Sequence, residues 1–195
     1  MTKRTAQLGL FLALALILAY VESLIPFSFG IPGIKLGLPN LVVVLLLYGE
    51  DATQRNVGQN FTYQNGAAQA DIGQNDTGGS NVRDALTVNI LRIVLSGFLF
   101  GNLYTILYSL SGAAFSFIAM LIGRRMRCFS VVGVSVLGGV FHNIGQIIVA
   151  MFVVETVYVG YYIPVLIAAG AVTGAVLGIV AMELIPYLAR FPRRQ

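Results

Sequence analysis

The sequence predicts an all-α, polytopic membrane protein with six transmembrane helices, and three observations support this fold class. Hydrophobic residues make up 57% of the 195 residues and charged residues only 10%, whereas soluble domains carry about 25% charged residues. The mean hydropathy of the chain is +0.82. The apolar residues also form continuous runs, which suit membrane helices, rather than the short alternating strands of a membrane β-barrel. A water-soluble fold is therefore not expected.

The first two predicted helices flank a polar loop. An apolar run over residues 8–25 stops at Pro26, because proline cannot continue a helix. A short helix over residues 39–48 follows. The sequence "PGIKLGLPN" at residues 32–40 joins them, and its prolines and glycines predict a tight, restricted path.

Four further apolar runs approach the roughly 20 residues that a membrane helix needs. A Gly-Asn turn separates the first two, an arginine-rich segment follows the second, and a loop near residues 155–162 separates the last two. These four predicted helices span residues 85–100, 103–122, 130–154 and 162–188.

The basic residues predict the orientation of the helices. With six spans, three groups of Lys and Arg fall on one side, which the positive-inside rule makes cytoplasmic. Both termini are then cytoplasmic, residues 32–40 face outward, and the chain is a multi-pass protein of a prokaryotic cytoplasmic membrane. The three groups are Lys3 and Arg4; Arg124, Arg125 and Arg127; and Arg190, Arg193 and Arg194.

Residues 50–84 interrupt the predicted membrane domain, which otherwise covers the whole chain, 1–195. This segment is polar, rich in Gln, Asn, Gly and Asp, and has no apolar period. Such composition predicts a disordered cytoplasmic insertion. A partner-binding role is an alternative to a passive insertion, and the passive role is favoured.

The predicted third helix carries a polar face. Asn89, Arg92 and Ser96 are spaced i, i+3, i+7, so they share one side of the helix. A charge in the middle of a membrane helix is costly unless it is paired or hydrated. Arg92 is therefore either a ligand-binding cation, which is favoured, or the partner of a structural ion pair with Glu22 or Glu183.

The predicted fifth helix carries a second polar stripe. Imidazole and amide groups can both donate and accept hydrogen bonds, so the stripe can line a polar ligand cavity. The alternative is hydrogen bonding between helices, but the density of polar groups favours the cavity. The stripe contains Ser135, Gly139, His142 and Gln146, with Gly138 and Asn143 flanking it.

Small residues predict close helix contacts in two places. Gly170, Gly174 and Gly178 repeat every fourth residue in the last helix, a spacing typical of tight helix packing. Ala15 and Ala19 repeat in the same way in the first helix, and we expect their face to meet another subunit.

Tyr104 and Tyr108 lie one turn apart in the predicted fourth helix, where their rings can stack on a ligand. The alternative is a place in the aromatic belt at the membrane surface, which suits Tyr104 better than Tyr108.

The sequence contains no signature of a soluble enzyme. It has no phosphate-binding GxxxxGK[ST] loop, no HExxH and no GxSxG motif. It has one cysteine, one histidine and no aspartate-rich motif, so we expect no catalytic residues, no metal site and no cofactor. The net charge of +4 suits cytoplasmic loops rather than nucleic acid.

Several segments together resemble a known family. They are "PGIKLGLPN" (32–40), "LRIVLSGFLFGN" (91–102), "YSLSGAAFSFIAM" (108–120), "GVSVLGGVFHNIGQIIVA" (133–150) and "YYIPVL" (161–166). They resemble the Gx transporter family, also called heptaprenyl diphosphate synthase component I, over nearly the whole chain except residues 50–84. That family is similar to the substrate-binding S-components of energy-coupling factor (ECF) transporters.

The resemblance implies a function. S-components are six-helix proteins that bind a vitamin-like ligand near the outer face and dock on a coupling subunit with ATPases through small residues of helix 1, a pattern that Ala15 and Ala19 match. We therefore expect uptake of a small anionic vitamin-, isoprenoid- or flavin-related ligand. The alternatives are a membrane accessory of isoprenoid or quinone biosynthesis and a subunit of a flavin-linked electron-transfer system. The expected ligand-binding residues are Lys35, Asn40, Asn89, Arg92, Tyr104, Tyr108, His142, Asn143 and Gln146.

Overall fold

The computed structural model describes residues 2–24, 35, 37–49, 78–126 and 129–189, and within these ranges it contains helices joined by short turns and no strand. The predicted all-α class is confirmed. The helices lie within one to three residues of their predicted ends, except at the starts of the first and third. They are α1 Thr2–Leu24, a short helix Asn40–Gly49, α3 Gly78–Phe100, α4 Leu103–Arg125, α5 Val131–Val153 and α6 Ile163–Ala189, with a 3₁₀ turn, η1, at Val157–Tyr162 before α6.

Four of the helical segments are long and apolar enough to cross a membrane: Arg4–Leu24, Leu103–Arg125, Val131–Val153 and Val157–Leu188. Large apolar side chains also lie on the surface, including Leu10, Phe98 and Val172, each at least 65% exposed. A membrane environment explains this surface, because lipid covers apolar side chains at no cost. The structure thus supports a membrane protein, and six crossings remain a prediction.

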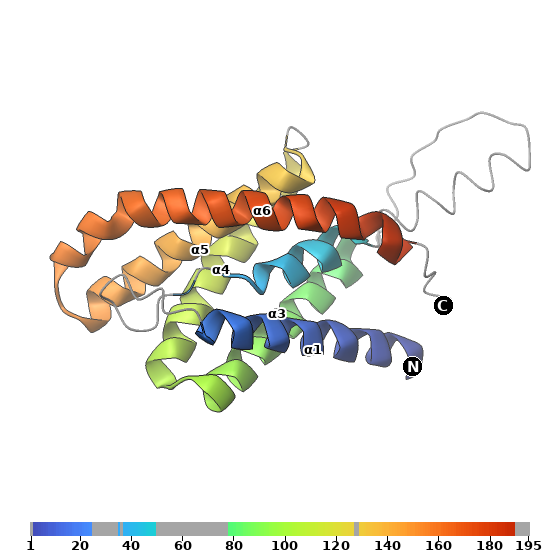
Figure 1. Ribbon diagram of the computed structural model, residues 1–195, viewed down its shortest axis with the longest axis horizontal. Coiled ribbons are helices and arrows are strands. Elements are labelled where there is room, and N and C mark those ends of the chain that lie inside the picture. The colour runs from blue at the N-terminus through green and yellow to red at the C-terminus, as the bar shows by residue number, and fades with distance from the viewer. Residues whose placement is uncertain (1, 25–34, 36, 50–77, 127–128, 190–195) are drawn as a thin grey trace, which may run out of the picture.

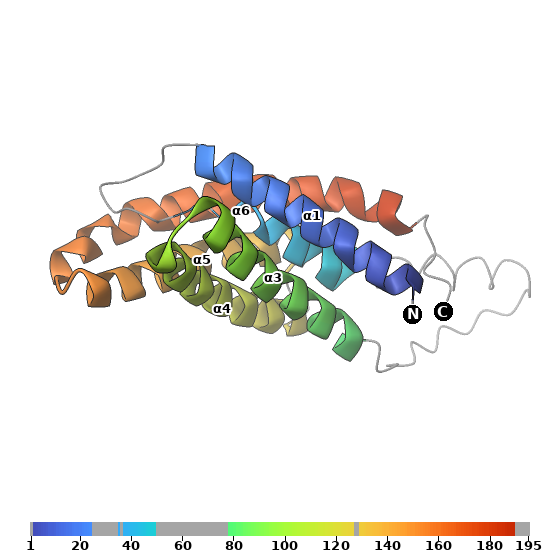
Figure 2. The ribbon, with the colours of Figure 1, turned by 90° about the horizontal axis from the view of Figure 1, so that it is seen from below.

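The helices run lengthwise beside one another, and α1 begins at the same end of the molecule at which α6 ends (Figure 1). α5 packs against both α4 and α6, whereas α1 packs against α3 (Figure 2). Successive helices run in opposite directions along the long axis, as the alternating topology of the sequence analysis requires.

The short helix forms the centre of the bundle. Every residue from 41 to 47 is buried, with at most 6% of its surface exposed. A helix that is apolar on all sides avoids water either by facing lipid or by packing inside protein, and this helix is covered by protein. Those neighbours come from α1, α3, α4, α5 and α6, and they include Ala15, Val88, Phe117, Val134 and Leu177.

The glycines of α6 bring its backbone against α5, as predicted. A Cβ atom on Gly174 would lie 2.7 Å from both the Ser135 carbonyl oxygen and the Val136 Cα. A Cβ atom on Gly178 would lie 2.7 Å from the Val132 Cα. The two backbones are therefore in direct contact, and they can separate only if one of the two helices moves as a whole.

The beginning of α3 corrects one prediction. The helix starts at Gly78, not at residue 85, so the predicted disorder of residues 78–84 is wrong. Asp84 accepts two hydrogen bonds from the Arg4 guanidinium, at 2.8 and 3.3 Å, which ties the first turns of α3 to α1. Ala85, next in sequence, is fully buried. The rest of the predicted insertion, residues 50–77, lies outside the described residues.

We expect Gly174→Ala to lower the free energy of unfolding by about 1–3 kcal/mol, because the new methyl group meets backbone atoms that cannot rotate away. Thermal unfolding of the purified protein in mild detergent measures the change. Gly9→Ala is the matched control, because nothing lies within 4 Å of a Cβ atom there. Equal stability of the two variants would contradict the direct α5–α6 backbone contact.

Candidate functional site

A buried carboxylate near the end of α1 holds the loop that leads into the short helix. The Glu22 Oε1 atom accepts hydrogen bonds from the backbone N–H groups of Gly37 and Leu38, the latter at 3.3 Å. Glu22 itself is only 6% exposed. The loop backbone would otherwise lie inside the bundle with unpaired donors, which is costly. Glu22 thus fixes the entry to the short helix.

The same loop rests on α5. The backbone N–H of Lys35 donates to Gln146 Oε1 at 3.3 Å. Gly37 adopts φ +83°, a left-handed conformation that favours glycine. A Cβ atom there would lie 2.9 Å from Asn40 Nδ2 and 3.0 Å from His142 Cδ2. Gly37 is therefore required for both its conformation and the space that Asn40 and His142 fill.

The imidazole of His142 lies between two glycines. Gly37 approaches its Cδ2 and Nε2 atoms, and Gly112 of α4 approaches its Cε1 and Nδ1 atoms, with a Cβ on Gly112 only 2.9 Å from either. The same Cβ would lie 2.9 Å from Gln146 Cγ. The loop, α4 and α5 thus meet around His142, whose exposed fraction is 2%.

The polar face of α3 is buried, as predicted. Asn89, Arg92 and Ser96 are each at most 4% exposed. The Arg92 Nε atom donates to Asn89 Oδ1 at 2.9 Å. Among the described residues, no ion pair joins Arg92 to Glu22 or to Glu183, although the charges of Arg92 and Glu22 interact. The structural ion pair considered from the sequence is therefore not formed.

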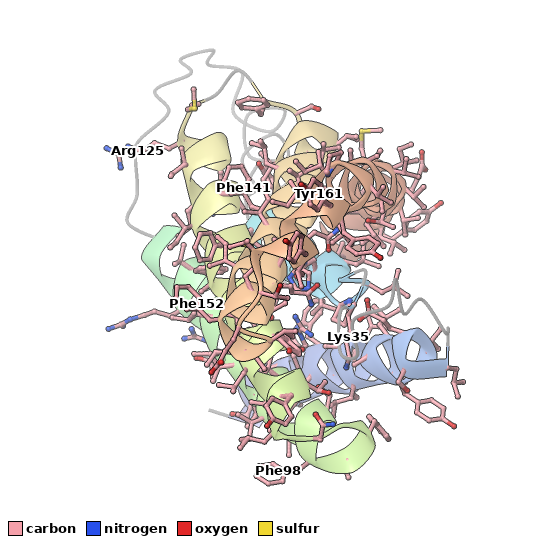
Figure 3. The ribbon with its side chains drawn as sticks, turned by 90° about the vertical axis from the view of Figure 1, so that its left-hand side faces the viewer. Lys35, Phe98, Arg125, Phe141, Phe152 and Tyr161 are labelled. Carbon is pink, nitrogen blue, oxygen red and sulfur yellow. The ribbon has the colours of Figure 1, made fainter. Side chains whose placement is uncertain are left out.

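The positive charge of Lys35 interacts with the charges of Glu22 and Arg92. Burial lowers the pKa of its amino group below the ordinary value of 10.5, Glu22 opposes this change, and the positive charge of Arg92 adds to it. In the view along the long axis in Figure 3, Lys35 lies within the outline of the helices, whereas Arg125 and Phe98 project from its periphery. Two cations and one carboxylate therefore share this region.

The buried polar side chains where the loop, α3 and α5 meet form a polar cluster, and several of its atoms have no hydrogen-bond partner. In the described part of the chain, six fully buried side-chain atoms make no hydrogen bond, and five belong to residues predicted as ligand-binding. The Gln146 oxygen accepts a hydrogen bond from the backbone N–H of Lys35, so the Gln146 nitrogen is the atom that lacks a partner. The five are Asn40 Nδ2, Arg92 Nη2, His142 Nδ1, Asn143 Oδ1 and Gln146 Nε2.

Two other predicted site residues, Tyr104 and Tyr108, do not join this cluster, and Asn143 of the cluster has a second role. Tyr104 is 57% exposed, so the predicted stacking on a buried ligand is not supported, and the aromatic-belt alternative suits it. Tyr108 is buried, but in an apolar cluster with Ile147 and Leu166. Asn143 donates to the Leu166 carbonyl oxygen at 2.7 Å, which makes it a bridge between α5 and the beginning of α6.

The prediction that Ala15 and Ala19 form a partner-binding face of α1 is wrong. Ala15 and Ala19 are 0% and 2% exposed, so they cannot meet another subunit. Ala15 belongs to the core around the short helix. Their small side chains let α1 approach the rest of its own chain. The outward face of α1 carries larger residues, including Leu10, Ile17 and Leu24.

Two residues that shape the site were missed by the sequence analysis. Glu22 was considered only as a partner for Arg92, although a lone carboxylate at the end of an apolar helix could have indicated a buried role. Gly112 lies in a run of small residues, and nothing else in the sequence distinguishes it as a residue that shapes the site. The described residues contain no group of three or more His, Cys, Asp or Glu side chains able to hold a metal ion.

We expect Glu22→Ala to release the loop backbone and to cost about 1–3 kcal/mol of stability, because two buried N–H groups lose their acceptor. Hydrogen exchange at Gly37 and Leu38 should accelerate, and thermal unfolding should shift downward. Glu183→Ala, at an exposed position of α6, is the control. Unchanged exchange at residues 37 and 38 in the Glu22 variant would contradict the proposed anchor.

Comparison with known proteins assigns the chain to a family. The family model described as heptaprenyl diphosphate synthase component I matches residues 11–55 and 79–184, more than half of the chain. The unmatched residues between them fall within the predicted insertion. No curated protein and no solved structure matches the chain. The similarity to S-components stays a prediction, whereas the resemblance to this family is confirmed, and the chain belongs to the heptaprenyl diphosphate synthase component I family.

Proposed function

We propose that the chain is an integral membrane ligand-binding subunit, similar to an S-component, which takes up a small anionic ligand. The observation that carries this proposal is the set of buried, unpartnered donors on Asn40, Arg92 and Gln146. Buried donors in folded proteins almost always find an acceptor. An acceptor-bearing ligand between the loop, α3 and α5 would satisfy all three.

The position of the cluster supports uptake. Glu22 lies near the end of α1 that is remote from Arg4. Apart from Arg92, the described arginines lie near the end of the molecule at which α1 and α3 begin and α4 ends (Figure 2); they are Arg4, Arg83, Arg124 and Arg125. If the arginine-rich end is cytoplasmic, as the positive-inside rule indicates, the cluster lies toward the outer face. A ligand from outside the cell would then approach the cluster from the side of Lys35 and Gly37.

The energy for uptake would come from partner proteins, because the sequence contains no nucleotide-binding motif. A coupling subunit with ATPases is the expected partner by analogy with S-components. Ala15 and Ala19 are not part of this interface, since both are buried within the chain.

A second candidate function is that of a membrane accessory in isoprenoid or quinone biosynthesis. The description of the matched family favours it. In that case the chain would assist a synthase rather than carry out the reaction alone, because it contains no aspartate-rich motif. Prenyl diphosphate elongation that depends on adding the purified chain to a partner synthase would support this function.

We expect native mass spectrometry of the purified protein to show a bound small molecule, and Arg92→Gln to reduce its occupancy at least about tenfold. A lost charge-assisted hydrogen bond of about 1.5–3 kcal/mol gives this magnitude. Arg83→Gln is the matched control, since it removes the same charge from an exposed position of the same helix.

Two results would contradict the proposal. One is full occupancy in the Arg92 variant, which would move the ligand away from the cluster. The other is the absence of any small molecule from protein that has been purified together with its partners.

A further inference from the structure

We infer that the site selects a monoanionic group, such as a carboxylate, over a diphosphate. This inference rests on the proposed function, because it specifies which anion the buried donors receive. It concerns the charge of the ligand's head group alone and leaves the remainder of the ligand open.

The charge balance of the cluster is the first argument. Arg92 and Lys35 supply two positive charges, and Glu22 supplies one negative charge among them. If Glu22 is ionised and His142 is neutral, the net charge of these groups is a single positive one. Charges inside an apolar bundle are costly unless they are compensated. One negative charge on the ligand completes the balance, whereas the two or three of a diphosphate exceed it.

The role of Glu22 is the second argument. Its Oε1 atom accepts from the backbone N–H groups of Gly37 and Leu38, so the carboxylate is fixed in place by the loop. It cannot move aside for a ligand without releasing the entry to the short helix. A multiply charged head group would therefore meet the ionised Glu22 carboxylate at a fixed position, and each additional negative charge on the ligand increases this repulsion.

The donor set is the third argument. The unpartnered donors are Nη2 of one guanidinium and two primary amides, Asn40 Nδ2 and Gln146 Nε2. The side chains of Arg92, Asn40 and Gln146 are each at most 4% exposed. A carboxylate has two oxygens with about four acceptor sites, which matches such a small set. A diphosphate has more acceptor oxygens than these groups can satisfy.

A matched set of ligands tests the inference. Geranic acid, geranyl diphosphate and geraniol share one ten-carbon chain and differ only in the head group. Binding of each to the full chain in lipid nanodiscs is measured by calorimetry, and empty nanodiscs give the correction for partition into lipid. We expect geranate to bind at least about tenfold more tightly than either of the other two, from one charge-assisted hydrogen bond.

Two variants separate charge from shape. Arg92→Gln should weaken geranate binding at least about tenfold, whereas Arg83→Gln should leave it unchanged. Glu22→Gln keeps an oxygen that can accept from the loop but removes the negative charge. It should therefore shift the preference from geranate toward geranyl diphosphate, while hydrogen exchange at Gly37 and Leu38 confirms that the loop stays in place.

The outcomes distinguish this inference from the proposed function. Tighter binding of geranyl diphosphate than of geranate by the unaltered chain, still dependent on Arg92, would overturn the inference and leave anion binding standing. A preference that Glu22→Gln does not change would also overturn it. Binding of none of the three, together with a co-purified ligand whose occupancy does not depend on Arg92, would overturn both.

Discussion

A guanidinium inside an apolar bundle has to be compensated, and the arrangement of the site follows from that requirement. Arg92 is 4% exposed and makes one side-chain hydrogen bond, to Asn89, the neighbour one turn earlier on α3. Its charge interacts with that of Glu22, but the two described residues do not form an ion pair, and the Glu22 Oε1 atom binds the backbone of the loop instead. The cost of burying Arg92 is therefore only partly offset by the protein, and a bound anion would offset the rest.

The short central helix links this site to the rest of the fold. Its apolar body, residues 41–47, is surrounded by five other helices, and its first residue, Asn40, belongs to the polar cluster. Gly37 and Gly112 leave room for His142 on both sides. Core packing and site geometry are thus coupled, because a shift of the short helix would move Asn40 and the loop that Glu22 and Gln146 hold.

Much of the fold could be predicted from the sequence, because apolar runs and their interruptions determine where membrane helices begin and end. The buried faces of α3 and α5 were also predictable, since Arg92 and His142 cannot face lipid. Contacts between segments that are distant in the sequence could not be predicted in this way. Ala15 and Ala19 fit an interface with another subunit or with the chain itself, and the spacing alone does not distinguish the two. Tyr104 and Tyr108 share a helix face, yet only tertiary packing decides that one is exposed and the other buried.

The most direct test of a ligand-completed cluster is an experimental density map of the protein purified with its native lipids. We expect density for a non-protein group in contact with Arg92 Nη2 and with at least one of the amides of Asn40 and Gln146. We also expect Glu22 to remain bonded to the backbone of Gly37 and Leu38. A map in which the Arg92 guanidinium closes on the Glu22 carboxylate, with the amides paired to protein groups, would contradict the ligand-completed cluster.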